Sequence, residues 1–295
     1  MSVRINRAIE LLAAGQPVSY FGEHSGHVLT FAQGQKDAQT WADYINVGME
    51  HGAFDMAGLD AYLAGLAAGG PTASGHRMPA VIVEPPVDAT SEAVIRANAW
   101  QFRQLLARGI HGLLLCMAES AEAVRAFIAA CRYPIHMQGV GEGLSRGTRG
   151  KGGEATAAAV WGIRPEEYLE RADAWPLNPQ GELLLGVKIE SPAGVANVEQ
   201  ILSVPGLGFA EMGPNDLSFA LGHRKFSRDP YHPPELGEAR ERILRACKKN
   251  GVAFLECCAP GTVAAKMDEG VAIVTGGRPD TAAAARAHAR QAHSE

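Results

Sequence analysis

Eight short apolar runs alternate with helix-like segments along the chain, and this alternation limits the folds that it can adopt. The runs have the length and composition of buried strands, and they cover residues 18–21, 44–47, 80–84, 112–116, 183–190, 209–212, 253–257 and 271–275. The segments with helical spacing cover residues 55–68, 91–107, 120–130, 166–174, 193–203, 234–250, 261–269 and 279–293. Strands that alternate with helices predict a parallel sheet, and eight is the strand number of a closed (β/α)₈ barrel. A doubly wound open sheet is the competing fold, but no G-x-G-x-x-G motif follows the first strand.

Length and composition favour one barrel domain over residues 1–295. The chain is 46% hydrophobic and 20% charged, so it can bury a large core, and its formal net charge of −5 argues against nucleic acid as a partner. It has no apolar run of the roughly 18 residues that would indicate a membrane span, and the N-terminus lacks the apolar core of a signal peptide. The five cysteines have no CxxC spacing and are best explained as buried thiols of a reducing compartment. We therefore expect a soluble, cytoplasmic protein without a membrane partner.

A glycine-rich segment at about residues 132–162 interrupts the alternation. It is too long for an ordinary connector, and structureless segments of this length are often lids or binding loops. Its basic residues could bind an anionic substrate through guanidinium groups and backbone amides; they are Arg146, Arg149 and Lys151. A flexible surface loop is the alternative.

Two acidic residues follow neighbouring strands near the middle of the chain. Glu190 ends the run GVKIE, and Asp216 comes shortly after the run GFAEM. In a parallel sheet both carboxylates would reach the same end, where two hard oxygen ligands make a plausible Mg²⁺ or Mn²⁺ site. The alternative is that Glu190 is a solvated loop residue and Asp216 a helix cap.

Further polar side chains are expected at the same end of the barrel. Glu84 ends the third strand, and Glu50 and His51 follow the second. Side chains alternate along a strand, so Lys188 should share a face with Glu190, where a lysine must be paired, neutral or functional. An imidazole with a pKa near neutrality makes His51 the first candidate for acid–base catalysis. Histidines in the loop after the first strand are weaker candidates for metal ligation or for lining the pocket.

Three of these segments together resemble the HpcH/HpaI aldolase and citrate lyase family. They are the strand end at Glu190, the turn Gly213-Pro214-Asn215-Asp216-Leu217 and the segment Met49-Glu50-His51-Gly52, in the family's order. The resemblance extends from about residue 9 to about residue 289. It implies a (β/α)₈ barrel with a divalent metal ion.

The resemblance also assigns roles to residues. Glu190 and Asp216 correspond to the family's metal ligands, and His51 corresponds to its catalytic base. The residues that would contact the substrate are Gly213, Pro214, Asn215 and Arg146.

The chain departs from the family pattern at three positions. Gly48 stands where the family has an aspartate that orients the histidine, so Glu50 or Glu84 would have to orient His51 instead. Glu84 stands where the family has an arginine, and a carboxylate cannot donate hydrogen bonds to an oxyanion. Lys188 stands where the family often has glutamine. The two exchanges could re-create an ion pair of reversed sign, in which Lys188 supplies the charge that Glu84 does not.

We therefore expect a divergent member of the family: a metal-dependent aldolase or lyase that makes or breaks a carbon–carbon bond in a small hydroxy-oxo acid. Its partners would be a 2-oxo acid and an aldehyde, with His51, Glu84 and Lys188 as catalytic residues. Alternatives are a CoA-ester lyase of the citrate lyase type, a Schiff-base aldolase that uses Lys188, and a degenerate barrel that only binds a metabolite. The alanine-rich last helix predicts a homo-oligomer, from dimer to hexamer.

Overall fold

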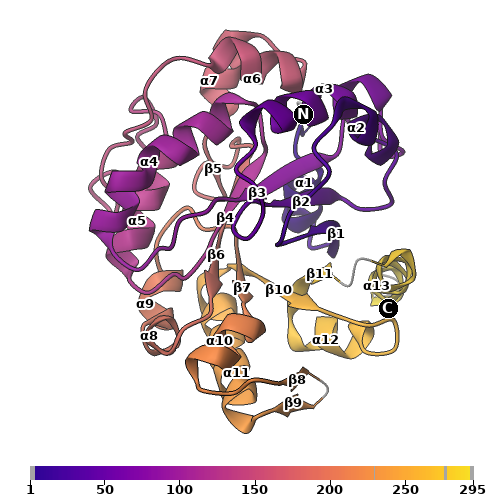
Figure 1. Ribbon diagram of the computed structural model, residues 1–295, viewed down its shortest axis with the longest axis vertical. Coiled ribbons are helices and arrows are strands. Elements are labelled where there is room, and N and C mark those ends of the chain that lie inside the picture. Colours follow the sequence, from indigo (N-terminus) through magenta and orange to yellow (C-terminus); the bar gives the residue numbers. More distant parts are fainter. Residues whose placement is uncertain (1–3, 229, 276–277, 293–295) are drawn as a thin grey trace.

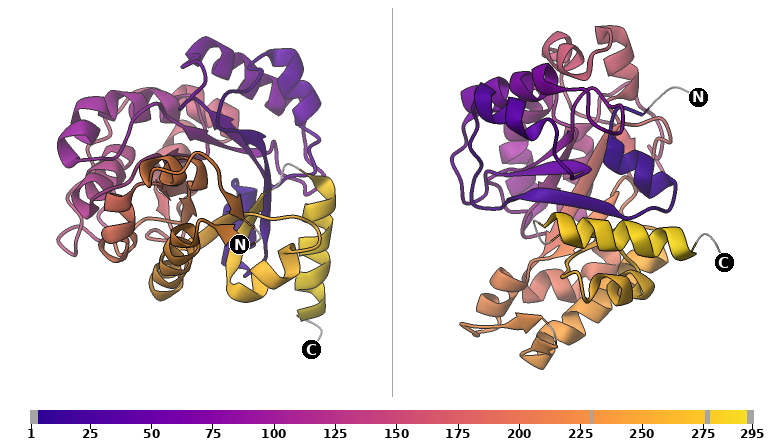
Figure 2. Two further views of the ribbon diagram at one scale, coloured as in Figure 1. Left: turned by 60° about the horizontal axis from the view of Figure 1, so that its bottom comes forward. Right: turned by 90° about the vertical axis from the view of Figure 1, so that its right-hand side faces the viewer.

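The computed structural model describes residues 4–228, 230–275 and 278–292. Within them, eight parallel strands close into a barrel with helices on the outside (Figures 1 and 2). The ring closes where β4 pairs with β6 and where β11 pairs with β1. The barrel strands are β1 (Val18–Glu23), β2 (Tyr44–Gly48), β3 (Ala80–Glu84), β4 (Gly112–Leu115), β6 (Leu183–Ile189), β7 (Phe209–Met212), β10 (Ala253–Cys257) and β11 (Val271–Thr275). The predicted (β/α)₈ fold is confirmed.

Many of the surrounding helices begin at residues whose side chains cap them. Asp55, Ser91 and Ser120 each accept a hydrogen bond from a backbone N–H of the first turn, which that turn cannot satisfy itself. The helices are α1 (Arg7–Ala13), α2 (Phe31–Asp37), α3 (Met56–Gly69), α4 (Glu92–Ala107), α5 (Ala121–Cys131), α6 (Glu154–Trp161), α7 (Pro165–Arg171), α8 (Pro192–Ala196), α9 (Val198–Leu202), α10 (Pro214–Ala220), α11 (Pro234–Asn250), α12 (Val263–Glu269) and α13 (Pro279–Ala292). Short strands lie at β5 (Ala174–Trp175), β8 (Ser227–Arg228) and β9 (Tyr231–His232). None of the helices in the described ranges combines the length and apolarity that crossing a bilayer requires.

The barrel interior is apolar in its amino-terminal half and ionic toward the carboxyl ends of the strands. The apolar half is one buried cluster to which alternate strand residues contribute, and it includes Tyr20, Tyr44, Ile82, Leu114, Leu184, Phe209, Leu255 and Ile273. Ala8 and Ile9 of α1 belong to the same cluster, so α1 closes the amino-terminal end. Continuing the alternation up the strands brings Asn46, Glu84, Lys188 and Glu211 inward above this floor.

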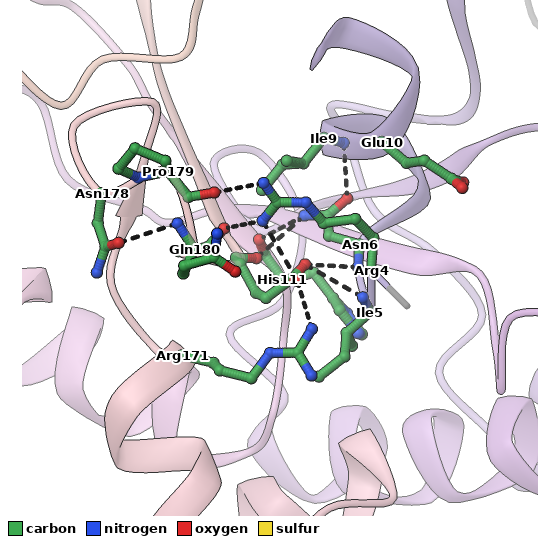
Figure 3. Close-up of polar contacts among 12 residues, drawn as sticks. Arg4, Ile5, Asn6, Ile9, Glu10, His111, Arg171, Asn178, Pro179 and Gln180 are labelled. Atoms are coloured by element: carbon green, nitrogen blue, oxygen red, sulfur yellow. Dashed lines mark hydrogen bonds and ion pairs between the residues drawn. The ribbon is translucent and has the colours of Figure 1, made fainter. Parts of the chain in front are cut away.

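The N-terminal segment is fixed to the start of β6 by a buried carboxylate. Glu182 has no exposed surface, and it accepts hydrogen bonds from the Asn6 backbone N–H at 2.9 Å and from Arg171 at 2.7 Å. The Asn6 amide donates to the His111 carbonyl at 3.1 Å, and Arg4 donates to the Pro179 carbonyl, as Figure 3 shows. These contacts hold α1 against the amino-terminal end of the barrel.

The segment at 132–162 differs from the prediction in two ways. Its last part is not a loop, because residues 154–161 form α6. The rest begins where α5 ends, and α5 runs back from the carboxyl end of β4, so the segment starts at the amino-terminal end of the barrel. Arg132 pairs there with Asp173 at 2.6 Å, and the Thr148 N–H bonds the Ala129 carbonyl at 2.7 Å.

This path corrects the prediction that Arg146 lines the mouth of the barrel. Its side chain is exposed, and its chain neighbours pack on the end of α5. Within one barrel, Arg146 therefore lies at the end opposite Glu190 and Asp216.

The C-terminal helix α13 packs on its own barrel. It contacts α12 and β11, and its small residues Ala282, Ala285 and Ala289 are buried. Arg286 donates to the Trp41 carbonyl at 3.0 Å and pairs with Asp43 at 3.1 Å.

Candidate active site

An ionic cluster occupies the carboxyl ends of the barrel strands, and Lys188 lies at its centre. Its Nζ atom is 2.6 Å from Glu50 Oε2, 3.5 Å from Glu190 Oε2 and 3.6 Å from Glu84 Oε2. The predicted ion pair between Lys188 and Glu84 is present, but Glu50 is the closer partner. Lys188 is only 4% exposed. Burial opposes its charge, but Cys116 and the surrounding carboxylates, Glu84 first among them, raise the pKa of Lys188, which is held as an ammonium.

Glu84 is buried, and its carboxylate contacts the side chains of His24, Asn46 and Lys188. Its carboxylate accepts from His24 Nδ1, at 2.7 and 2.8 Å to the two oxygens, and from the Asn46 amide at 2.6 Å. Burial alone would raise the pKa of Glu84, but the His24 hydrogen bond and the Lys188 charge lower it. Burial likewise works against a charged His24, but the bond to Glu84 and the nearby Glu211 carboxylate raise the pKa of His24 to about 9. At neutral pH the pair is an imidazolium and a carboxylate.

His24 reaches Glu84 because the residue beneath its loop is glycine. A Cβ atom on Gly48 would lie 2.1 Å from the His24 carbonyl oxygen and 2.4 Å from that of Glu23. These contacts are far closer than any side chain allows, so the loop after β1 crosses β2 only over a glycine. The aspartate that the family resemblance implies at this position would not fit, and His24 comes to the mouth instead.

Glu190 is buried beside the turn that carries Asp216. Its Oε1 accepts from the Met117 N–H at 2.8 Å, whereas its Oε2 has no hydrogen-bond donor among the described residues. Burial raises the pKa of Glu190 to about 7 against the lowering effect of Lys188. A Cβ atom on Gly213 would lie 2.0 Å from Glu190 Oε2, so this glycine lets the carboxylate pack against the turn.

The turn itself opens a helix. Gly213 is the N-cap of α10, Pro214 follows it, and Asp216 lies in the first turn with a half-buried side chain. The N–H groups of Asn215 and Asp216 have no intrahelical acceptor at such a position. Both are therefore available beside the Glu190 carboxylate.

His51 is less well held than the sequence predicted. Its side chain is 57% exposed, and its Nε2 atom is 3.8 Å from Glu50 Oε1, beyond a hydrogen bond. Glu84, the other candidate to orient it, bonds His24 instead. His51 thus lies at the rim of the mouth without a fixed ring orientation.

The donor atoms fit a divalent cation. Among the described residues, three groups place ligand atoms within 4.8 Å of one another: Glu50, His51 and Asp216; Glu50, Cys116 and Glu190; and His24, Glu50 and Glu84. Glu190 and Asp216 belong to different groups, which share Glu50. The carboxyl groups outnumber the cations at the mouth, and Glu190 Oε2 is a buried oxygen without a donor, so a further positive charge is favoured there. Oxygen donors of this kind suit Mg²⁺ or Mn²⁺.

Several of these residues were not predicted as site residues. The alternation that pairs Lys188 with Glu190 also places Asn46 and Glu211 on the inner face, so both were within reach of sequence reasoning. Glu211 is buried, and burial raises its pKa. His24 was only one of the loop histidines offered as weaker candidates, and nothing in the sequence distinguishes it from His27, because its position depends on the path of a loop.

A cavity of about 410 Å³ at the amino-terminal end is the weaker candidate for a site. Its ionisable residues are already paired with one another or with neighbours. Arg286 pairs with Asp43, and His76 lies 3.3 Å from Glu10.

Residues 76–278 match the family described as HpcH/HpaI aldolase/citrate lyase. The chain belongs to this family. Among its relatives, a hydroxypyruvate/pyruvate aldolase of Delftia acidovorans is 35% identical over 164 residues, which are 55% of this chain and 51% of the relative. A 2-keto-3-deoxy-L-rhamnonate aldolase of Klebsiella pneumoniae is 34% identical over 167 residues, 55% of this chain and 54% of the relative. The matched region thus spans about half the length of each of these curated relatives.

The likeness in fold is not confined to the matched region. A crystal structure of an HpcH/HpaI aldolase/citrate lyase family protein from Burkholderia cenocepacia matches with a TM-score of 0.71 and 22% identity, over 98% of this chain and all of that one.

Proposed function

We propose that this family member is a divalent-metal-dependent aldolase or lyase that makes or breaks the carbon–carbon bond next to the carbonyl of a small 2-oxo acid. The observation that carries the proposal is the buried Glu190 oxygen without a donor, packed against the turn that presents Asp216. The aldolase names of the relatives from Delftia acidovorans and Klebsiella pneumoniae support the same reaction class.

Glu190 and Asp216 would hold the metal ion, Mg²⁺ or Mn²⁺. A bound divalent cation supplies Lewis acidity, which polarises a carbonyl and lowers the energy of a neighbouring carbanion. The Lys188 ammonium lies within 3.6 Å of Glu50, Glu84 and Glu190, and its charge lowers the pKa of Glu84 and opposes the rise that burial causes in the pKa of Glu190.

The rim of the mouth would handle the substrate. The N–H groups of Asn215 and Asp216, in the first turn of α10, would donate to one oxygen of the substrate carboxylate. His51 is exposed to solvent at the rim, and we assign it proton transfer at the oxygen of the aldehyde partner. Its freedom to reorient suits a group that meets the second substrate after the first has bound.

The environment of Lys188 disfavours a Schiff-base mechanism. An amine must be neutral to attack a carbonyl, and the carboxylates around Lys188 raise its pKa. Cyanoborohydride trapping with pyruvate should therefore leave the protein unmodified, whereas a Schiff-base aldolase would be alkylated at Lys188.

The decisive experiment presents the Mg²⁺- or Mn²⁺-loaded protein with pyruvate and a panel of aldehydes. We expect aldol product that disappears with a chelator and in a Glu190→Gln variant. Cleavage of an acyl-CoA without aldol activity would instead indicate the citrate lyase reaction. Binding of pyruvate without turnover of any aldehyde would indicate a barrel that only binds a metabolite.

Assembly is a further proposal. We propose a homo-oligomer between dimer and hexamer, with α13 near the interface, because closed symmetric assemblies are common among such enzymes.

A further inference from the structure

We infer that His24 binds the carboxylate of the 2-oxo acid at the mouth of the barrel, and that Glu84 is the residue that positions its ring. The inference rests on the proposed function for the identity of the ligand. It assigns a contact to a residue outside the three segments that carry the family resemblance. No covalent step is involved: the Nε2–H group of His24 donates to a carboxylate oxygen.

The geometry leaves one edge of the His24 ring for a ligand. Nδ1 is held by both Glu84 oxygens, at 2.7 and 2.8 Å. Nε2 has no hydrogen-bond partner among the described residues, and the side chain is 39% exposed. The carboxylate that orients the ring is itself fixed by Asn46 at 2.6 Å. The ring is therefore anchored on its buried side and open on its solvent side.

The loop that carries His24 is anchored on both sides. Its start crosses Gly48 in close contact. Farther along, His27 Nε2 bonds the Tyr62 hydroxyl at 2.9 Å and Asp37 at 3.1 Å. A donor held this way loses little freedom on binding, which is the condition for effective recognition of an anion.

The charges around His24 explain why a donor is needed there. Glu84 on β3, Glu211 on β7 and Glu50 beyond β2 surround the mouth with negative charge, and Lys188 on β6 is buried beneath them. An anionic substrate entering this field requires a cationic donor that reaches solvent. Glu84, at the end of β3, only accepts hydrogen bonds. Its bond to Nδ1 favours the protonated His24 ring, so that Nε2 can act as the donor.

The test compares His24→Gln with a matched variant in the same loop, His27→Gln. Pyruvate is titrated into each metal-loaded protein by calorimetry, and the histidine rings of the wild type are followed by ¹⁵N NMR. We expect pyruvate to shift the Nε2 resonance of His24, and His24→Gln to weaken pyruvate binding about tenfold to a hundredfold, as for a lost charge-assisted hydrogen bond. His27→Gln should lower the melting temperature and keep the pyruvate affinity.

Glu84→Gln tests the positioning role separately. It should weaken pyruvate binding at neutral pH and restore part of it as the pH falls and the His24 ring gains its proton. A purely structural role of Glu84 would give a weakening independent of pH.

The outcomes separate this inference from the proposed function. A folded His24→Gln protein with wild-type pyruvate affinity, or an unshifted Nε2 resonance, overturns the inference even if aldol activity is found. Binding that depends on His24 without any aldol turnover supports the inference and defeats the proposed function. A wild type that does not bind pyruvate overturns both.

Discussion

The carbonyl oxygen of His24 lies where a side chain on residue 48 would begin, 2.1 Å from the Cβ position of Gly48. One glycine thus decides the path of the loop after β1. From the resemblance alone, Gly48 would mean that the aspartate that orients the histidine has been lost. The structure shows a position that no side chain can occupy while His24 is bonded to Glu84.

Replacing Gly48 with alanine should displace the loop after β1 and reduce the free energy of unfolding by about 1–3 kcal/mol or more. The added methyl group would clash with the backbone of Glu23 and His24, which cannot move aside as a flexible side chain can. Thermal unfolding measures the loss, and the His24 ring signals should move at the same time. Gly150→Ala is the control, since a Cβ atom there meets nothing within 4 Å. Equal melting temperatures for both variants would show that the loop adjusts without cost.

Replacing Lys188 with methionine should destabilise the protein by about 3–5 kcal/mol, the usual effect of removing one partner from a buried ion pair. Glu50, Glu84 and Glu190 would then face one another without the ammonium. Urea unfolding gives the measurement, with Lys151→Met as the control because Lys151 is exposed. A loss below about 1 kcal/mol, the range of surface pairs, would mean that the cluster holds another cation.

The His24 ring should keep its proton well above the ordinary range. NMR titration of the wild type should give a pKa of about 9, and Glu84→Gln should move it down toward the ordinary value of about 6.5. Because the folded-state pKa is raised, His24 contributes stability that is fully present below about pH 6.5 and is lost as the pH rises through about 9. A wild-type midpoint near 6.5 would contradict the His24–Glu84 pair.

Metal binding should depend on Glu190 and Asp216. Glu190→Gln and Asp216→Asn should each weaken Mn²⁺ binding by at least about tenfold, measured by electron paramagnetic resonance of free Mn²⁺ without substrate. Glu142→Gln, on the exposed segment at the other end of the barrel, serves as the control. Unchanged Mn²⁺ affinity in both variants would move the metal site elsewhere in the cluster.

Light scattering over a wide concentration range should give the mass of a homo-oligomer. A single monomer mass at every concentration would contradict that expectation. In that case the exposed face of α13 would simply be a solvent surface.

The barrel strands were predictable because a strand buried on both faces is a short apolar run between turn signals. The same alternation predicted that Lys188 and Glu190 share a face, and the resemblance supplied Asp216. The structure confirms the shared face, because Lys188 Nζ lies 3.5 Å from Glu190 Oε2. Asp216 lies in the first turn of α10, and its role as a metal ligand stays a prediction.

Positions set by contacts between distant segments were not predictable. His24 reaches Glu84 through a loop whose path depends on Gly48, and neither residue shows this in its own surroundings. The resemblance placed Arg146, in the segment at 132–162, among the substrate contacts, but Arg132 pairs with Asp173 and holds the start of this segment at the other end of the barrel. Four helices were also missed (α1, α2, α6 and α10), each of eight residues or fewer, where a helical period has little length to show itself.

The apolar floor of the barrel separates the charged cluster from the amino-terminal end. Tyr20 and Tyr44 stack at 4.8 Å, and Phe209 fills the space that Gly186 leaves empty, directly beneath the level of Lys188. We therefore expect ions and substrate to reach the cluster from the mouth side. The amino-terminal half includes the contacts of Glu182 with Asn6 and Arg171. It could therefore be redesigned for thermal stability without changing the charges around Lys188.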